Sequence, residues 1–123
     1  MKDERSVIVK MIGFCDAIES DVARMGPDIE DFLGNESFQR SCCFSLIQLG
    51  EYVKRLSSET RNRFAYVDWT GIAALRNIIA HDYDVIDPVE IWNTVTKEVP
   101  ELRGNLVRIK DEMGPQGETT QSS

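Results

Sequence analysis

Residues 69–83 of the chain read Trp-Thr-Gly-Ile-Ala-Ala-Leu-Arg-Asn-Ile-Ile-Ala-His-Asp-Tyr. At about 100° per residue, the aliphatic side chains of Ile72, Leu75 and Ile79 fall on one stripe of an α-helix. Asn77 and His81 are four residues apart and share the opposite side of that helix. The stretch therefore predicts a helix that packs one stripe against a core and leaves a polar side for another purpose.

The same helical spacing recurs before this stretch. Apolar residues three and four positions apart predict long helices over residues 4–25 and 36–57. The short acidic segment 28–33 is compatible with one helical turn, and the polar residues 57–63 are expected to form a loop. Asp68 is placed to cap the helix that follows this loop.

A further helix is predicted after Asp87. This residue is suited to cap the helix, Pro88 occupies the first helical position and Glu90 the third. The apolar spacing then continues through Pro100, where the missing N–H and the steric clash of the ring predict a kink or a break. Trp92 is in phase with the aliphatic residues, which indicates a core anchor, and the same argument applies to Trp69.

The chain contains no internal repeat and no run of alternating polar and apolar residues typical of a strand. We therefore predict an all-α fold, an antiparallel bundle of four to five helices. The predicted helices define a single domain over residues 1–113. Residues 114–123 have no apolar side chain to bury and are predicted to be a disordered C-terminal tail.

Composition excludes several classes of protein. A 123-residue chain that is 41% hydrophobic and 28% charged is typical of one soluble domain. No apolar run approaches the roughly 18 residues of a membrane span, so no membrane association is expected. The charged N-terminal sequence Met-Lys-Asp-Glu-Arg differs from a secretory signal, and a cytoplasmic location is therefore expected.

The cysteines do not indicate a metal site. Cys15, Cys42 and Cys43 are odd in number, and one histidine cannot complete a zinc-binding set with them. Buried, reduced thiols are the simpler interpretation. We expect neither a metal nor another cofactor.

The charge distribution leaves nucleic-acid binding open. A net charge of −7 argues against a protein that coats nucleic acid nonspecifically. Residues 54–76, however, contain five basic and two acidic side chains and precede the polar end of the 69–83 helix. These arginines could equally be solvated side chains around a loop.

Arg76, Asn77 and His81 together suit metal-free cleavage of a phosphodiester. Histidine transfers protons near neutral pH, and arginine stabilises the charge that builds on phosphorus when a ribose 2′-hydroxyl attacks it. The reaction needs one group to accept a proton and another to donate one, whereas the chain has a single histidine. A symmetric dimer would supply both groups. Alternatively, Arg76 pairs with an acid such as Asp82, Asp84 or Asp87, and His81 caps the helix or packs at its end.

Several segments resemble one protein family, the HepT-like branch of the HEPN superfamily. They are residues 69–83, Asp87, Trp92 and the Glu-Val-Pro-Glu-Leu segment that ends at Leu102. Less specific matches precede them, at Leu46, Leu49, Gly50, Glu51 and Leu56. The resemblance covers roughly residues 5–110. Its specific part is the pattern Arg-Asn-x3-His-x-Tyr, which the chain matches at Arg76, Asn77, His81 and Tyr83.

This resemblance implies a toxin of a type VII-like toxin–antitoxin system, a homodimeric, metal-independent endoribonuclease with a composite cleft that acts on RNA. Arg76 and His81 would be its catalytic pair, with Asn77 in support. Tyr83 would be the hydroxyl that an MntA-like nucleotidyltransferase antitoxin modifies with AMP. An alternative role for Tyr83 is that of an aromatic residue packed on Trp92. A separate alternative for the whole protein is a non-catalytic helical partner that binds substrate for the nucleotidyltransferase.

Overall fold

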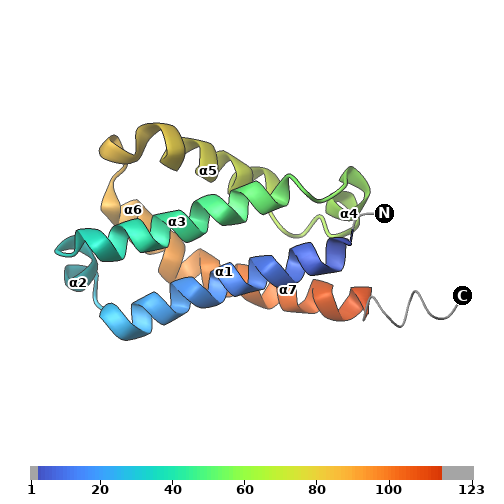
Figure 1. Cartoon of the computed structure of the whole chain (residues 1–123), viewed down its shortest axis with the longest axis horizontal. Coiled ribbons are helices and arrows are strands. Elements are labelled where there is room, and N and C mark those ends of the chain that lie inside the picture. Colours follow the sequence, from blue (N-terminus) through green and yellow to red (C-terminus); the bar gives the residue numbers. More distant parts are fainter. Residues whose placement is uncertain (1–2, 115–123) are drawn as a thin grey trace, which may run out of the picture.

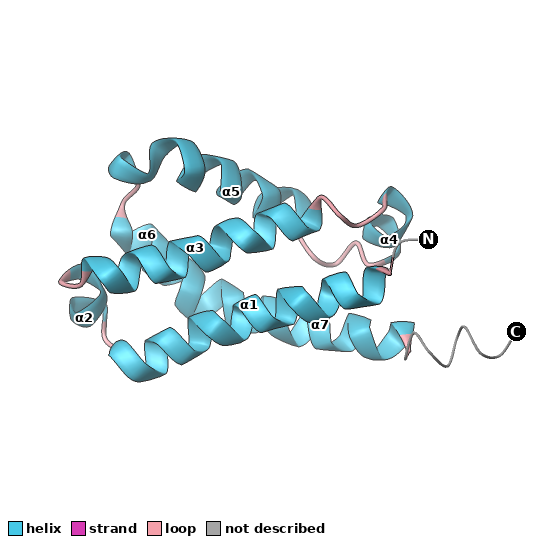
Figure 2. Ribbon diagram, in the orientation of Figure 1, coloured by secondary structure: helices cyan, strands magenta, loops and turns pink. Residues whose placement is uncertain are grey.

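The structure is a computed structural model that describes residues 3–114. Regular structure in this range is helical, without strands (Figure 2). In chain order the elements are α1 (Glu4–Met25), α2 (Ile29–Leu33), α3 (Glu36–Val53), α4 (Ser58–Arg63), α5 (Trp69–Asp82), η1 (Tyr83–Val85), α6 (Pro88–Asn93), η2 (Thr94–Glu98) and α7 (Val99–Met113). The all-α prediction is confirmed. The tail was predicted over residues 114–123, of which 115–123 lie outside the described residues.

The four long helices α1, α3, α5 and α7 run alternately in opposite directions along the molecule (Figure 1). α1 packs against α3 and α7, and α3 packs in addition against α5. α5 and α7 have no comparable packing, so the ring of helices is open between them. The predicted antiparallel bundle is confirmed, with one side left uncovered.

Side-chain caps define where the site-bearing helices begin. Asp68 accepts a hydrogen bond from the Gly71 amide at 3.0 Å and starts α5. Asp87 accepts from the Val89 amide at 2.9 Å and starts α6. Each cap satisfies an amide that has no partner within its helix. Both predicted caps are confirmed.

Two predicted boundaries before α5 are wrong. Residues 58–63 form α4 and not a loop, because Ser57 caps them by accepting from the Thr60 amide at 3.1 Å. α3 ends at Val53, four residues earlier than predicted. The next amides bond to carbonyls three residues back, and these tighter turns still bury Leu56 in the core.

The helix is continuous across Pro100, so the predicted break is wrong, but its geometry changes just before the proline. The five residues of η2 form a π-helical turn that joins α6 to α7, and Pro100 follows in the first turn of α7. Proline has no N–H to donate to the carbonyl four residues earlier. A wider turn at this point is consistent with the loss of that hydrogen bond.

Aromatic side chains fill one end of the core. The Trp92 ring centroid lies 5.2 Å from that of Phe32 and 6.0 Å from that of Phe38. Trp69 is also buried and donates its indole N–H to the Phe64 carbonyl at 3.1 Å. Both tryptophans are core anchors, as predicted.

The three cysteines are buried free thiols, as predicted. Burial raises the pKa of Cys15 and Cys42 to about 12 and that of Cys43 to about 11. At neutral pH these groups are therefore protonated and unreactive. No helix within residues 3–114 is long and apolar enough to cross a membrane.

Candidate functional site

The polar residues of α5 lie on its outer surface because the opposite stripe packs into the core. Ile79 is buried, whereas Asn77 and His81 are exposed. The Arg76 side chain lies between these two sides and is 25% exposed. α5 therefore presents these three polar groups away from the core.

A close approach between α3 and α5 fixes the position of Arg76. A Cβ atom on Gly50 of α3 would overlap the Cβ of Arg76 and lie 2.9 Å from its Cγ and 3.1 Å from the Ile72 carbonyl oxygen. The two helices can pack at this distance only because Gly50 has no side chain. Gly50 thus sets the point from which the Arg76 side chain extends.

Two neighbours hold the Arg76 guanidinium. Its Nε forms an ion pair with the Glu51 carboxylate of α3, and its Nη1 donates to Asn77 Oδ1 at 3.1 Å. The alternative in which Arg76 pairs with an acid is confirmed, but the acid is Glu51 and not Asp82, Asp84 or Asp87. Sequence reasoning gave Glu51 no role, because the spacing of residues does not show which carboxylate meets an arginine 25 positions away.

His81 stands apart from these contacts. It is exposed, and no residue within 3–114 forms a hydrogen bond or an ion pair with it. Five helical positions separate it from Arg76, a rotation of about 140°. Within one chain the two side chains therefore lie on different sides of α5 and do not contact each other.

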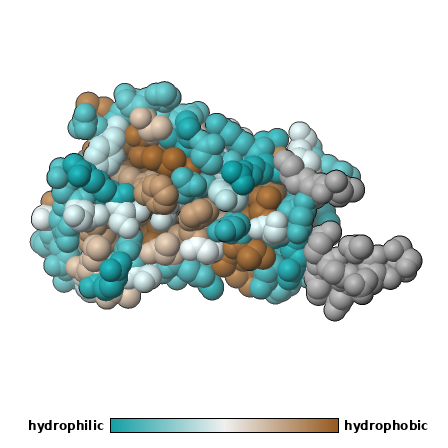
Figure 3. Space-filling view, viewed as in Figure 1, coloured by the Kyte–Doolittle hydropathy of each residue, from teal (hydrophilic) through white to brown (hydrophobic). Residues whose placement is uncertain are grey.

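An exposed aromatic ring extends this surface along α3. Phe44 is 60% exposed and lies seven residues before Glu51, on the same stripe of α3. Since α3 and α5 are antiparallel, the step from Glu51 to Phe44 runs toward the His81 end of α5. We call the surface of Phe44, Glu51, Arg76, Asn77 and His81 the α3–α5 face. Hydrophobic side chains gather over the boundary of these helices (Figure 3).

Tyr83 is the first residue of η1, just beyond the end of α5. Its side chain is half-buried against the core, where it lines a hollow of about 240 Å³ with Cys43 and Ile86. No residue within 3–114 forms a hydrogen bond with its hydroxyl. Trp92 stacks on phenylalanines, and no ring pair joins it to Tyr83.

The basic segment before α5 does not surround His81. α4 lies at the end of the bundle opposite η1 (Figure 1), about 20 Å along α5 at 1.5 Å per residue. The Arg55 guanidinium stacks 4.2 Å from the Tyr52 ring centroid, and that of Arg63 4.7 Å from Phe64. Arg76 is the basic side chain of this segment that reaches the α3–α5 face. The described residues contain no group of three acidic, histidine or cysteine side chains that could hold a metal.

Comparison with known proteins adds an independent observation to this geometry. Residues 11–109, which include all of α3 and α5, match the family described as "Ribonuclease HepT-like". The chain belongs to the HepT-like ribonuclease family. The matched range contains Gly50, Glu51 and the polar residues of α5, so the α3–α5 face is part of the family domain.

Two named relatives illustrate the range of similarity among HepT-like proteins. "Putative RNase TTE0752" of Caldanaerobacter subterraneus subsp. tengcongensis is 32% identical over 109 residues, which cover 89% of this chain and 96% of the relative. "Probable ribonuclease HepT" of Thermococcus cleftensis is 26% identical over 66% of this chain and 74% of the relative. No solved structure gives a significant match.

We predict that Gly50→Ala lowers the free energy of unfolding by about 1–3 kcal/mol, because the added methyl group would overlap Arg76 Cβ. Chemical denaturation monitored by circular dichroism measures this change. Gly13→Ala is the matched control, since α1 has open space around Gly13 and alanine should stabilise the helix by about 0.5–1 kcal/mol. Equal effects of the two substitutions would contradict a close approach at Gly50.

Proposed function

We propose that this HepT-like protein is a metal-independent endoribonuclease whose composite site forms where two α3–α5 faces meet in a homodimer. The observation that carries the proposal is that one helix of a chain from a ribonuclease family bears a partly exposed Arg76 and exposed Asn77 and His81 outside the core. A guanidinium and an imidazole are the groups that phosphodiester cleavage without a metal requires.

The reaction is an internal transesterification. The ribose 2′-oxygen bonds to the adjacent phosphorus, and the bond from phosphorus to the 5′-oxygen of the next nucleotide breaks. One histidine accepts the 2′-hydroxyl proton and a second donates a proton to the departing 5′-oxygen. The products are a 2′,3′-cyclic phosphate and a 5′-hydroxyl, and no water is consumed.

The contacts of Arg76 suit it to hold the phosphate. A guanidinium has five N–H groups. One N–H faces Glu51 and one is donated to Asn77, which leaves three for phosphate oxygens. Glu51 and Asn77 keep the guanidinium in one orientation, which lowers the entropy lost when it binds.

The dimer follows from the number of histidines and from the exposed ring of Phe44. One chain supplies one imidazole, and a two-fold axis at the α3–α5 face would bring two together. Phe44, 60% exposed, would supply apolar contact next to the polar groups. Two guanidiniums would also meet there, each paired with the Glu51 of its own chain, and both would offer their remaining N–H groups to the RNA phosphate.

We expect the purified protein to cleave single-stranded RNA in EDTA and to leave cyclic phosphate ends. Arg76→Ala and His81→Ala should each lower the rate by at least about 100-fold, because each removes charge stabilisation or proton transfer in the transition state. Gel analysis of labelled RNA measures the rate. Arg108→Ala, on the exposed surface of α7, should cleave at the wild-type rate. Unchanged cleavage by His81→Ala would exclude the proposed chemistry.

A mixing experiment tests the composite site. Wild-type chains refolded with a tenfold excess of His81→Ala chains should lose roughly tenfold in activity per wild-type chain, because random pairing leaves few dimers with two histidines. The control is refolding with the same excess of an inactive variant that cannot pair. A site complete within one chain would instead keep its activity per wild-type chain.

The same proposal includes control by a partner protein. We propose that the protein is the toxin of a two-gene module, and that an MntA-like nucleotidyltransferase antitoxin transfers AMP from ATP to the Tyr83 hydroxyl with release of pyrophosphate. Tyr83 is two residues from His81 and its hydroxyl has no partner among residues 3–114. The added phosphate and adenosine would repel and obstruct an RNA strand at the α3–α5 face.

Incubation with the partner and ATP should therefore increase the intact mass by one or more AMP units, and RNA cleavage should fall in parallel. Tyr83→Phe should show no mass increase, whereas Tyr66→Phe, which alters an exposed tyrosine elsewhere, should be modified like the wild type. A mass increase that persists in Tyr83→Phe would assign the modification to another residue.

One observation favours a second function. Arg76 is already paired with Glu51 on an acidic chain, which weakens its attraction for RNA. The protein would then be a non-catalytic helical partner that presents substrate to a nucleotidyltransferase. Tight binding to that enzyme, together with no RNA cleavage and no growth arrest on expression, would favour this alternative.

A further inference from the structure

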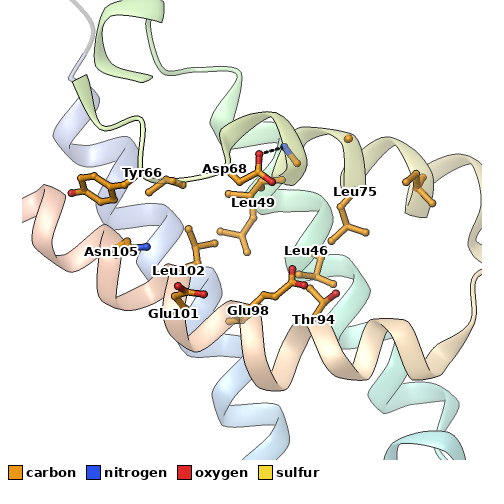
Figure 4. A pocket seen from close by; sticks show the side chains of 16 residues that line it. Leu46, Leu49, Tyr66, Asp68, Leu75, Thr94, Glu98, Glu101, Leu102 and Asn105 are labelled. Atoms are coloured by element: carbon orange, nitrogen blue, oxygen red, sulfur yellow. Dashed lines mark hydrogen bonds between the residues drawn. The ribbon is translucent and has the colours of Figure 1, made fainter. Parts of the chain in front are cut away.

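The open side of the helical ring forms a groove on the side of α5 that faces away from Arg76. Since α5 and α7 do not pack closely, a hollow of about 690 Å³ opens between them (Figure 4). Leu46 and Leu49 of α3 form its floor, and Leu75 and Leu102 lie on its two walls. Leu46 and Leu49 are buried, whereas Leu75 and Leu102 are partly exposed, so the apolar surface that remains open to solvent is on the walls.

The apolar surface continues beyond this hollow. A second hollow of about 280 Å³ shares Leu75, Ile78 and Thr94 with the first. Ile78 is 48% exposed, and at the far end Val85 is 79% exposed. We call the two hollows together the α5–α7 groove. Its length of several helical turns and its row of aliphatic side chains match the surface that receives an amphipathic helix in helix-in-groove recognition.

Acidic residues border the groove. The carboxylates that line the two hollows are Asp68, Asp87, Glu90, Glu98 and Glu101, and no lysine, arginine or histidine lines either hollow. Asp68 and Asp87 cap helices, but the three glutamates form no ion pair within residues 3–114. Glu98 and Glu101 lie along the wall opposite α5 (Figure 4). The border therefore has unpaired negative charge beside an apolar floor.

We propose that the α5–α7 groove binds a basic amphipathic helix of a separate partner protein. Apolar side chains spaced at i, i+4 and i+7 would occupy the floor, and flanking lysines or arginines would pair with Glu90, Glu98 and Glu101. The negative border disfavours RNA, because a phosphate backbone would be repelled.

The exposed surface of the chain itself does not fit this groove. Its exposed large apolar residues within 3–114 are Val9, Leu33, Phe44, Tyr66, Ile78, Val85 and Val89, and no helix has more than one of them. A second copy thus offers no apolar stripe to insert, and its net charge of −7 opposes the acidic border. A separate protein with a basic amphipathic helix would supply both the apolar stripe and the positive charge.

The groove and Arg76 are on different sides of α5. Ile78 is two residues from Arg76, a rotation of about 200°. His81 is seven residues after Ala74, which lines the groove, so His81 lies on the stripe of α5 that borders the groove. A helix in the groove would leave Arg76 uncovered, and its end near Val85 would lie at η1, which begins at Tyr83. The groove proposal does not depend on RNA cleavage.

The test uses a synthetic helical peptide with leucines at i, i+4, i+7 and i+11 and lysines on both flanks. Fluorescence anisotropy should give saturable binding that weakens at least tenfold for Ile78→Lys and for the double variant Glu98→Lys with Glu101→Lys. Val9→Lys and the double variant Glu30→Lys with Glu59→Lys are matched controls, since they place the same changes on exposed sites outside the groove. Both controls should bind like the wild type.

Three results would overturn the proposal. The first is equal binding of a peptide whose leucines are scrambled, or of one whose lysines are replaced by glutamates. The second is peptide affinity that the groove variants leave unchanged while circular dichroism shows them folded. The third is dissociation of a homodimer by Ile78→Lys in sedimentation velocity, which would assign the groove to a second copy of the chain.

Discussion

The close approach of α3 and α5 at Gly50 determines the geometry of the whole α3–α5 face. A Cβ atom at Gly50 would meet the Cβ of Arg76, an atom that no change of rotamer can move away. The distance between the two helices is therefore set by backbone packing and not by flexible side chains. Because Arg76 extends from this contact, its guanidinium meets Glu51, which follows Gly50 directly on α3.

The Glu51–Arg76 pair has two opposing effects on a phosphate site. It fixes the direction of the guanidinium, and both side chains are only partly exposed, so solvent screens the pair less than it would on an open surface. It also cancels charge that would attract RNA. A symmetric copy would bring a second Glu51 with its second guanidinium, so a dimer would leave the net charge of the pairs unchanged and would instead double the N–H groups that remain for phosphate oxygens.

Much of the fold could be predicted from sequence, because the apolar spacing and the caps are local signals. Asp68 and Asp87 mark helix starts through contacts two or three residues away. The errors arose where the signal was weak or distant. α4 has no buried residue and so no apolar stripe to detect. The pairing of Arg76 with Glu51 depends on how α3 and α5 pack, which spacing along the chain does not contain.

The open side between α5 and α7 could not be predicted for a related reason. An apolar stripe shows that a helix packs against another element, but it does not show which element that is. Ile78 lies off the stripe of Ile79 and remains 48% exposed, because α7 packs on α1 and not on α5. α5 therefore separates Arg76 from the glutamates that border the groove. Since like charges repel, an RNA phosphate would favour the side of Arg76 over the acidic border, and a basic helix would favour the groove.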